Sequence, residues 1–141
     1  MEQDILYHGS QILFEGNLMP KKPNGNNFWS DSLCAVYATS VRELAIVHAI
    51  LKCDGVENSY WSLHEEPYGL ICSGWPKNEH IYLYTLPFNG FKQIGRAEQY
   101  VSFNPIKPIK IEKLTVSDNI NLVSIGTKDE RFRRKLYFDF I

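Results

Sequence analysis

The chain has 141 residues, a length that suits one domain with one core, so we expect residues 1–141 to form a single domain. Hydrophobic residues make up 44% and charged residues 22%, which is close to ordinary globular usage, and the formal net charge is −1. Such a charge gives no overall field that attracts nucleic acid or an anionic membrane. No apolar run approaches the ~20 residues that span a bilayer. The acidic N-terminus lacks the apolar core of a signal peptide, so we expect a cytoplasmic protein.

Cysteine and histidine spacing argues against a disulfide framework and against a metal site. The three cysteines, Cys34, Cys53 and Cys72, are odd in number and form no C-x-x-C pair. We expect them to be buried or half-buried thiols. His64 and His80 show no ligand spacing with Cys53 or Cys72, so we expect no metal.

Two short strands and a loop are predicted in the N-terminal third of the chain. Residues 4–8 are apolar enough for a strand, and residues 34–39 (CAVYAT) are short, apolar and β-prone. Between them, residues 16–32 are rich in Gly, Pro, Asn and Ser, which is typical of a loop.

A helix follows the second strand. Ser40 and Glu43 form the signature of a capping box, and Gly55 suits the end of the helix. One apolar stripe of this helix contains Val41, Leu44, Ala45, His48 and Leu51. His48 is therefore predicted to face the protein body rather than bulk water.

The remainder of the chain is predicted to be mainly β. Residues 56–67 look irregular, whereas residues 68–75, 80–87 and 91–116 have strand-like texture, with an Asn89-Gly90 turn and interruptions at Pro105 and Pro108. The last residues, LYFDFI, suit a final strand. One main helix and about six strands leave too few helices for βαβ crossovers, so we expect an α+β domain with mainly antiparallel or mixed sheets.

Three short motifs carry side chains with functional chemistry: residues 8–10 (HGS), 36–40 (VYATS) and 98–102 (EQYVS). In this order and spacing they resemble the ADP-ribosyltransferase-like superfamily, which includes diphtheria-like toxins and poly(ADP-ribose) polymerases. The closest resemblance is to small bacterial and phage members with YHGS, VYATS and YVSxxPhKP motifs, and it covers residues 5–55 and 80–112. It implies two small, mostly antiparallel sheets around a cleft, with one main helix, and NAD as the substrate.

The resemblance also implies a role for each residue of the first two motifs. His8 would hold a ribose hydroxyl of NAD, the Gly9 backbone would hold the nicotinamide amide, and Ser10 would give structural support. Tyr37 would stack on the nicotinamide ring, a contact for which a flat aromatic face is suited. His48, eleven positions later, stands where the polymerase branch has a second tyrosine, so that an imidazole replaces a phenol.

The third motif is where the family places its catalytic glutamate. Its carboxylate holds the nicotinamide-ribose 2′-hydroxyl and stabilises the positive charge that develops as nicotinamide leaves. Alignment on QYVSFNPIKP places Gln99 at that position, and a shift of one places Glu98 there. Neighbouring strand residues point to opposite faces, so only one of them lines the pocket unless a bulge intervenes. The chemistry favours Glu98, because an amide cannot supply the charge.

Every one of these residues also has an ordinary structural interpretation. His8 suits a satisfied histidine at a strand-to-turn junction, His48 suits a buried core histidine, and Tyr37 suits a core aromatic. Glu98 and Gln99 are equally compatible with a solvated strand. The functional interpretation therefore depends on whether the fold brings the motifs together.

Two functions follow, and both stay open on sequence alone. One is a mono-ADP-ribosyltransferase or NAD glycohydrolase that transfers ADP-ribose to an unknown acceptor (a protein, a nucleic acid or water). The other is a catalytically silent module that binds NAD or ADP-ribose, or a protein partner, on the same fold; Gln99 and the missing hydroxyl at Ala45 favour it. RNA 2′-phosphotransferases share the fold, but they use several arginines, and only Arg42 and Arg96 lie near the motifs. Nothing predicts strong nucleic-acid binding or a membrane partner.

Overall fold

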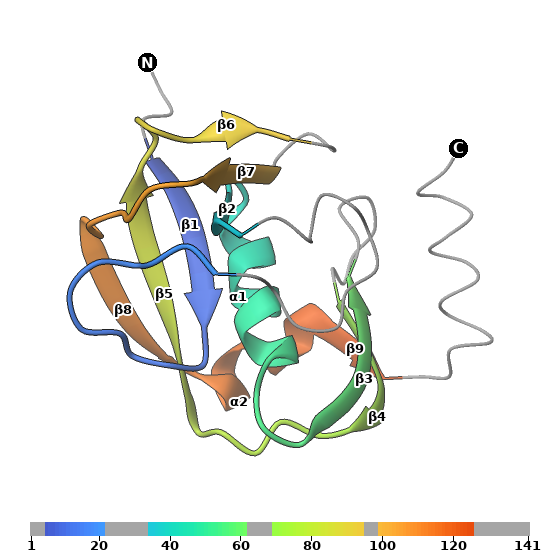
Figure 1. The fold of residues 1–141 in the computed structure, drawn as a ribbon. Helices are drawn as coiled ribbons and strands as arrows, with labels where there is room; N and C mark the ends of the chain where they lie inside the picture. The colour runs from blue at the N-terminus through green and yellow to red at the C-terminus, as the bar shows by residue number, and fades with distance from the viewer. Residues whose placement is uncertain (1–4, 22–33, 62–68, 95–98, 126–141) are drawn as a thin grey trace. The chain divides into compact units, whose positions relative to one another are not determined.

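The computed structural model describes residues 5–21, 34–61, 69–94 and 99–125 (Figure 1). Its elements, in chain order, are β1 (Ile5–Ser10), β2 (Val36–Thr39), α1 (Arg42–Leu51), β3 (Val56–Trp61), β4 (Gly69–Gly74), β5 (His80–Pro87), β6 (Lys92–Gln93), β7 (Gln99–Ser102), β8 (Lys110–Thr115), α2 (Val116–Asn119), the 3-10 helix η2 (Ile120–Leu122) and β9 (Val123–Ile125). None of the helices in the described ranges is long and apolar enough to cross a membrane.

The strands form two sheets. One has six strands in the order β6-β7-β2-β1-β5-β8, and the other has three in the order β3-β4-β9. β2 pairs antiparallel with both β1 and β7, and β3 pairs antiparallel with β4, whereas β4 and β9 are parallel. The expected α+β class with antiparallel and mixed sheets is therefore confirmed.

The chain divides into two compact units that interleave along the sequence. The first unit comprises residues 1–8, 14–42 and 84–111, and the second comprises residues 9–13, 43–83 and 112–141.

In the first unit, the segment after β1 is held by backbone hydrogen bonds. The N–H and C=O groups of buried Leu18 bond those of buried Ile106 at 2.8 and 3.0 Å, and Lys21 forms the same reciprocal pair with Ala35. Residues 16–21 are irregular apart from these bridges, as predicted, and residues 22–33 lie outside the described ranges. The Asn89-Gly90 turn is confirmed, because Gly90 has a φ of 95° and the Phe91 N–H bonds the Phe88 carbonyl at 3.1 Å.

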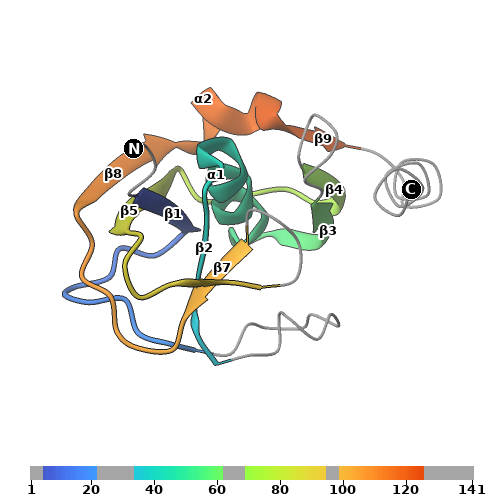
Figure 2. The ribbon, with the colours of Figure 1, turned by 90° about the horizontal axis from the view of Figure 1, so that it is seen from above.

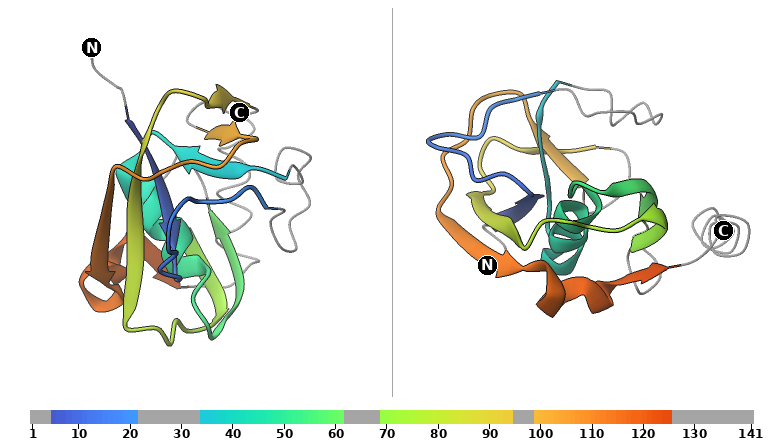
Figure 3. Two further views of the ribbon diagram at one scale, coloured as in Figure 1. Left: turned by 60° about the vertical axis from the view of Figure 1, so that its left-hand side comes forward. Right: turned by 90° about the horizontal axis from the view of Figure 1, so that it is seen from below.

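In the second unit, α1 is buried on more than one face. Its buried residues are Leu44, Ala45, Ile46, Val47, Ala49 and Ile50. A helix that is apolar on most of its circumference is packed on several sides. α2, η2 and β9 follow one another along one side of α1, and β3 and β4 lie along another (Figure 2 and the right-hand view of Figure 3).

Two glycines allow strands to approach α1 closely. A Cβ on Gly9 of β1 would lie 1.8 Å from the carbonyl oxygen of Ala45 and 3.1 Å from the Ala49 Cβ. A Cβ on Gly69 of β4 would lie 2.7 Å from Cγ1 of Val47. Gly9 faces backbone, which cannot rotate away, so no larger residue fits at that position.

The prediction of irregular structure over residues 56–67 is wrong for Val56–Trp61, which form β3. The strand pairs with β4, but its register shifts between Val56 and Ser59. Such irregularity breaks the two-residue alternation that identifies a strand in sequence. The LYFDFI segment at the C-terminus, predicted as a strand, lies outside the described residues.

The short helix α2 was not predicted, although its start has a recognisable signal. The Thr115 hydroxyl accepts the Asp118 N–H at 3.3 Å, which is an N-cap contact. A Ser or Thr followed three residues later by an acid is the corresponding sequence pattern, and at four residues the helix is too short to show periodicity.

The contact at Gly9 makes a stability prediction. We expect Gly9→Ala to lower the free energy of unfolding by about 3 kcal/mol or more, because β1 and α1 must separate to admit the methyl group. Gly16→Ala is the matched control: its φ is 78°, but nothing lies within 4 Å of the added Cβ. Its cost should be about 1 kcal/mol, from backbone strain alone. Urea unfolding measures both, and equal costs would contradict the packing argument.

Candidate functional site

His8 is tied to the backbone of Tyr37. Its Nδ1 lies 2.6 Å from the Tyr37 carbonyl oxygen. A carbonyl oxygen only accepts, so Nδ1 carries the proton and donates, and Nε2 is the acceptor nitrogen of the neutral ring. β1 and β2 pair antiparallel, with Tyr7 opposite Thr39, so the imidazole bonds the backbone of a neighbouring strand. The first and second motifs are therefore linked by this side-chain hydrogen bond as well as by sheet pairing.

Tyr84 of β5 packs against the His8 ring. Its ring is fully buried and meets the His8 ring edge-on, with centroids 6.0 Å apart. Its hydroxyl accepts the Phe14 N–H at 2.7 Å, and the Phe14 ring lies 5.9 Å away. The Lys21 ammonium lies 5.5 Å from the centroid of the Phe14 ring. Sequence reasoning missed Tyr84 and Phe14, because nothing in the local pattern links a β5 tyrosine to a histidine on β1.

Tyr37 and Gln99 occur on neighbouring strands. β2 and β7 pair at four positions, including Tyr37 with Val101 and Thr39 with Gln99. Directly opposed residues of an antiparallel pair point to the same face, and residues two apart do too. Tyr37 and Gln99 therefore share one face of the sheet, and both are half-buried. Glu98 lies outside the described residues.

Gly9 and Ser10 continue β1 in the second unit. The Cβ position of Gly9 is taken up by the close approach of α1. Ser10 is buried, and its hydroxyl accepts the Ile12 N–H at 3.0 Å, which holds the chain where the strand ends. These contacts explain why a glycine and a serine occupy positions 9 and 10 without reference to a ligand.

His48 lies on α1, one residue before Ala49, which contacts Gly9. The imidazole is half-buried and meets the Trp61 ring of β3 edge-on, with centroids 4.9 Å apart and planes at 73°. Trp61 was assigned to irregular chain by sequence, so this partner was missed. The ring contact orients the His48 imidazole, which is what either a pocket wall or a core histidine requires.

The structure thus brings three sequence-distant motifs onto the adjacent strands β1, β2 and β7. Within the first unit, His8 bonds Tyr37, and Gln99 lies on the Tyr37 face. Gly9, Ser10 and His48 belong to the second unit.

Metal and thiol chemistry find little support in the described ranges. No three His, Cys, Asp or Glu side chains there come together as metal ligands. Burial raises the pKa of the Cys53 thiol to about 11, and the Asp54 carboxylate adds to the rise. Cys53 is therefore a protonated core residue rather than a nucleophile. The expectation that all three thiols are at least half-buried is wrong for Cys34, which is exposed.

Compared with models of known protein families, with curated proteins and with solved structures, the chain shows no significant match. Function is therefore inferred from its side chains and their contacts.

The contacts of Tyr84 predict a hydroxyl-specific loss of stability. Tyr84→Phe leaves the part-buried Phe14 N–H without its acceptor, so the free energy of unfolding should fall by about 1–2 kcal/mol. Tyr82→Phe is the control on the same strand, two residues away, and should change it by less than about 0.5 kcal/mol. Chemical denaturation of both variants measures the difference. A Tyr84→Phe variant as stable as the control would exclude an energetic role for this bond.

Cysteine reactivity should follow burial and pKa. At pH 8, iodoacetamide should modify exposed Cys34 in the native protein and leave Cys53 intact, because a rise of the Cys53 pKa from 9.0 to about 11 lowers its thiolate fraction. Since the native pKa is the higher one, Cys53 should become reactive in the unfolded chain near pH 9, and in the native one only towards pH 11. Peptide mass spectrometry resolves the two sites. Equal labelling of Cys34 and Cys53 in the native protein at pH 8 would be inconsistent with this account.

Proposed function

We propose that the protein binds NAD beside the adjoining strands β1, β2 and β7 and breaks the bond between nicotinamide and ribose. ADP-ribose would then pass to an acceptor or to water, as in a mono-ADP-ribosyltransferase or an NAD glycohydrolase. The observation that carries this proposal is the meeting of the three motifs, through the His8–Tyr37 hydrogen bond and the β2–β7 register. The ADP-ribosyltransferase-like fold, with a cleft between its sheets, is part of the same proposal.

His8 suits a ribose contact in one defined way. Because Nδ1–H donates to the Tyr37 carbonyl, the neutral ring presents Nε2 as an acceptor. In that tautomer Nε2 would accept a hydrogen bond from a ribose hydroxyl rather than donate one. His8 and Tyr37 lie on the paired strands β1 and β2, so a ligand that touches both would lie beside this pair of strands.

Tyr37 would provide the flat surface for nicotinamide. Tyr37 and Gln99 lie on the same face of the sheet. An offset stack on an aromatic ring is the favoured geometry for a flat ligand such as nicotinamide. The family resemblance assigns the nicotinamide amide to the Gly9 backbone and the other wall to His48, and both of these residues belong to the second unit.

In this scheme, cleavage of the nicotinamide–ribose bond depends on the negative charge of Glu98. As the bond to nicotinamide breaks, positive charge develops on the ribose ring, and a carboxylate stabilises it. Gln99 can hydrogen-bond the ribose 2′-hydroxyl but adds no charge. No metal is required by this chemistry, and the acceptor is left open among protein, nucleic acid and water.

A second candidate is a module that binds NAD or ADP-ribose without turnover. It is favoured by the β2–β7 register, which puts Gln99 on the same face as Tyr37. An amide at that place would allow binding of the ribose without cleavage.

Nicotinamide release from NAD, followed by chromatography, tests the enzyme. Glu98→Gln should lower the rate roughly a hundredfold or more, because it removes a carboxylate without changing shape. Tyr37→Ala should also abolish release, whereas Tyr82→Ala, which changes a half-buried tyrosine outside the motifs, should keep it. If Glu98→Gln and Tyr37→Ala both released nicotinamide at the wild-type rate, the scheme would be wrong.

Calorimetry with NAD and with ADP-ribose separates the two candidates. A heat of binding without nicotinamide release in the wild type, together with nicotinamide release by Gln99→Glu, would establish the silent module. The Gln99→Glu change places a carboxylate on the Tyr37 face. If the wild-type protein gave neither a heat of binding nor released nicotinamide, both candidates would be rejected.

A further inference from the structure

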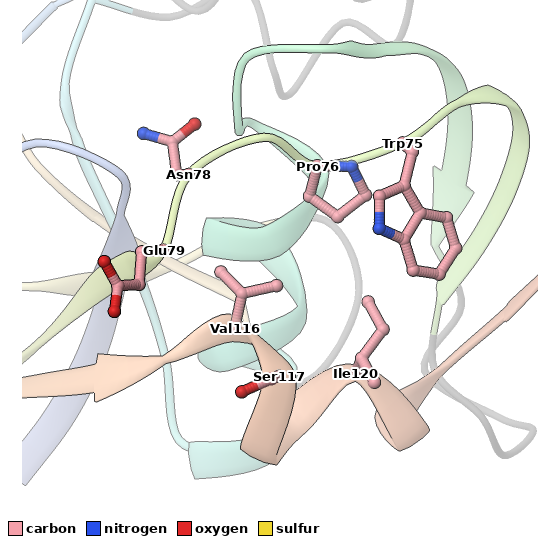
Figure 4. A pocket seen from close by; sticks show the side chains of 7 residues that line it. All are labelled: Trp75, Pro76, Asn78, Glu79, Val116, Ser117 and Ile120. Atoms are coloured by element: carbon pink, nitrogen blue, oxygen red, sulfur yellow. The ribbon is translucent and has the colours of Figure 1, made fainter.

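A pocket of about 260 Å³ lies in the second unit, between the β4–β5 connection and α2. Figure 4 shows Trp75 and Glu79 at opposite ends of the view, with Pro76 and Val116 between them. None of its lining residues belongs to the three motifs. Its volume is below the roughly 300–1,000 Å³ of drug-sized sites, so it suits a ligand the size of one side chain.

Backbone hydrogen bonds fix the walls of this pocket. The Val116 N–H donates to the Glu79 carbonyl at 3.0 Å, which joins α2 to the β4–β5 connection. The Trp75 N–H donates to the Gly55 carbonyl at 3.0 Å, and the Asp54 N–H donates to Oδ1 of Asn78 at 2.8 Å. The pocket is therefore preformed, and little ordering free energy is needed to bind a ligand there.

The apolar part of the pocket leaves a tryptophan uncovered. Trp75 is 48% exposed, whereas Pro76 and Val116 beneath it are buried. Its backbone is held by Gly55, which has a φ of 96°, and a Cβ on Gly55 would lie 2.2 Å from the Trp75 carbonyl oxygen. These contacts fix the backbone of Trp75 at the rim of the pocket, and its exposed ring offers a face for stacking or for a cation–π contact.

The polar part of the pocket has one charge. Glu79 is the only charged side chain among the lining residues, and it is exposed. No described residue forms an ion pair with its carboxylate. Asn78 and Ser117, the other polar lining residues, are neutral. An anionic ligand would meet uncompensated repulsion from Glu79, whereas a cation would gain a charge-assisted hydrogen bond.

We propose that this pocket binds an amphipathic organic cation, with an apolar stem over Val116 and Trp75 and a guanidinium or ammonium group at Glu79. The arginine or lysine side chain of a peptide has this chemistry, and so does a free alkylguanidine or alkylamine. The proposal is independent of NAD binding, because it uses none of the same residues.

The test is a titration of the full chain with butylguanidine and with butylurea, which have nearly the same shape and differ in charge. The readout is the indole N–H signal of Trp75 in ¹H–¹⁵N NMR spectra, assigned by its loss in Trp75→Phe. We expect a saturable shift with butylguanidine and at least roughly tenfold weaker binding of butylurea. Equal affinity of the two, or no shift of the Trp75 signal up to about 50 mM, would overturn the proposal.

Two variants test whether the Glu79 carboxylate binds the cationic group of the ligand. Glu79→Gln should weaken butylguanidine binding roughly tenfold or more, and Ser117→Ala, on the same pocket wall, should change it less than about twofold. Unchanged binding in Glu79→Gln would also overturn the proposal. The comparison of the two ligands on the wild type holds even if that variant fails to fold.

An acetyl-Ala-Arg-Ala-amide peptide distinguishes the source of the cation. Tighter binding of the peptide than of butylguanidine supports a peptide side chain as the ligand, and equal binding supports a free small cation. NAD binding measured in parallel should be the same in Glu79→Gln and in the wild type, so failure of one proposal is not mistaken for failure of the other.

Discussion

The close approach of β1 to α1 at Gly9 is the constraint on which most of the second unit depends. A side chain there would meet the Ala45 carbonyl at 1.8 Å, so the helix can be buried deeply only because position 9 has none. Gly69 repeats the arrangement with Val47 on β4. A helix packed this closely needs small residues at its contacts, and Ala45 and Ala49 meet that need.

Within the first unit, two partners orient the side chain of His8. The hydrogen bond to the Tyr37 carbonyl fixes the tautomer, and the buried ring of Tyr84 limits rotation of the imidazole. Tyr84 is held in turn by the Phe14 N–H, so the orientation of His8 depends on residues from three segments of the chain.

Sequence patterns predicted the elements whose residues obey one local rule. The strand over residues 80–87, the Asn-Gly turn and the apolar run of the main helix all appear in the structure, although the helix begins at Arg42. β3 was missed because its register shifts hide the alternation, and α2 was missed because it is one turn long. The ring contacts of His48 with Trp61 and of His8 with Tyr84, and the pocket beside Trp75, depend on long-range packing. No periodicity within one segment encodes them.

The choice between an enzyme and a binding module depends on a property of the β-strand itself. Successive residues alternate between faces, so a one-residue change in alignment exchanges a carboxylate for an amide. The pairing of Thr39 with Gln99 assigns the amide to the Tyr37 face. For Glu98 to act on the same ligand, the chain just before β7 would have to depart from regular strand geometry, as a bulge does when it turns a side chain towards a site. In the proposed enzyme, catalysis by Glu98 would therefore require a local backbone irregularity, whereas the proposed binding module would require only the regular pairing of β2 with β7.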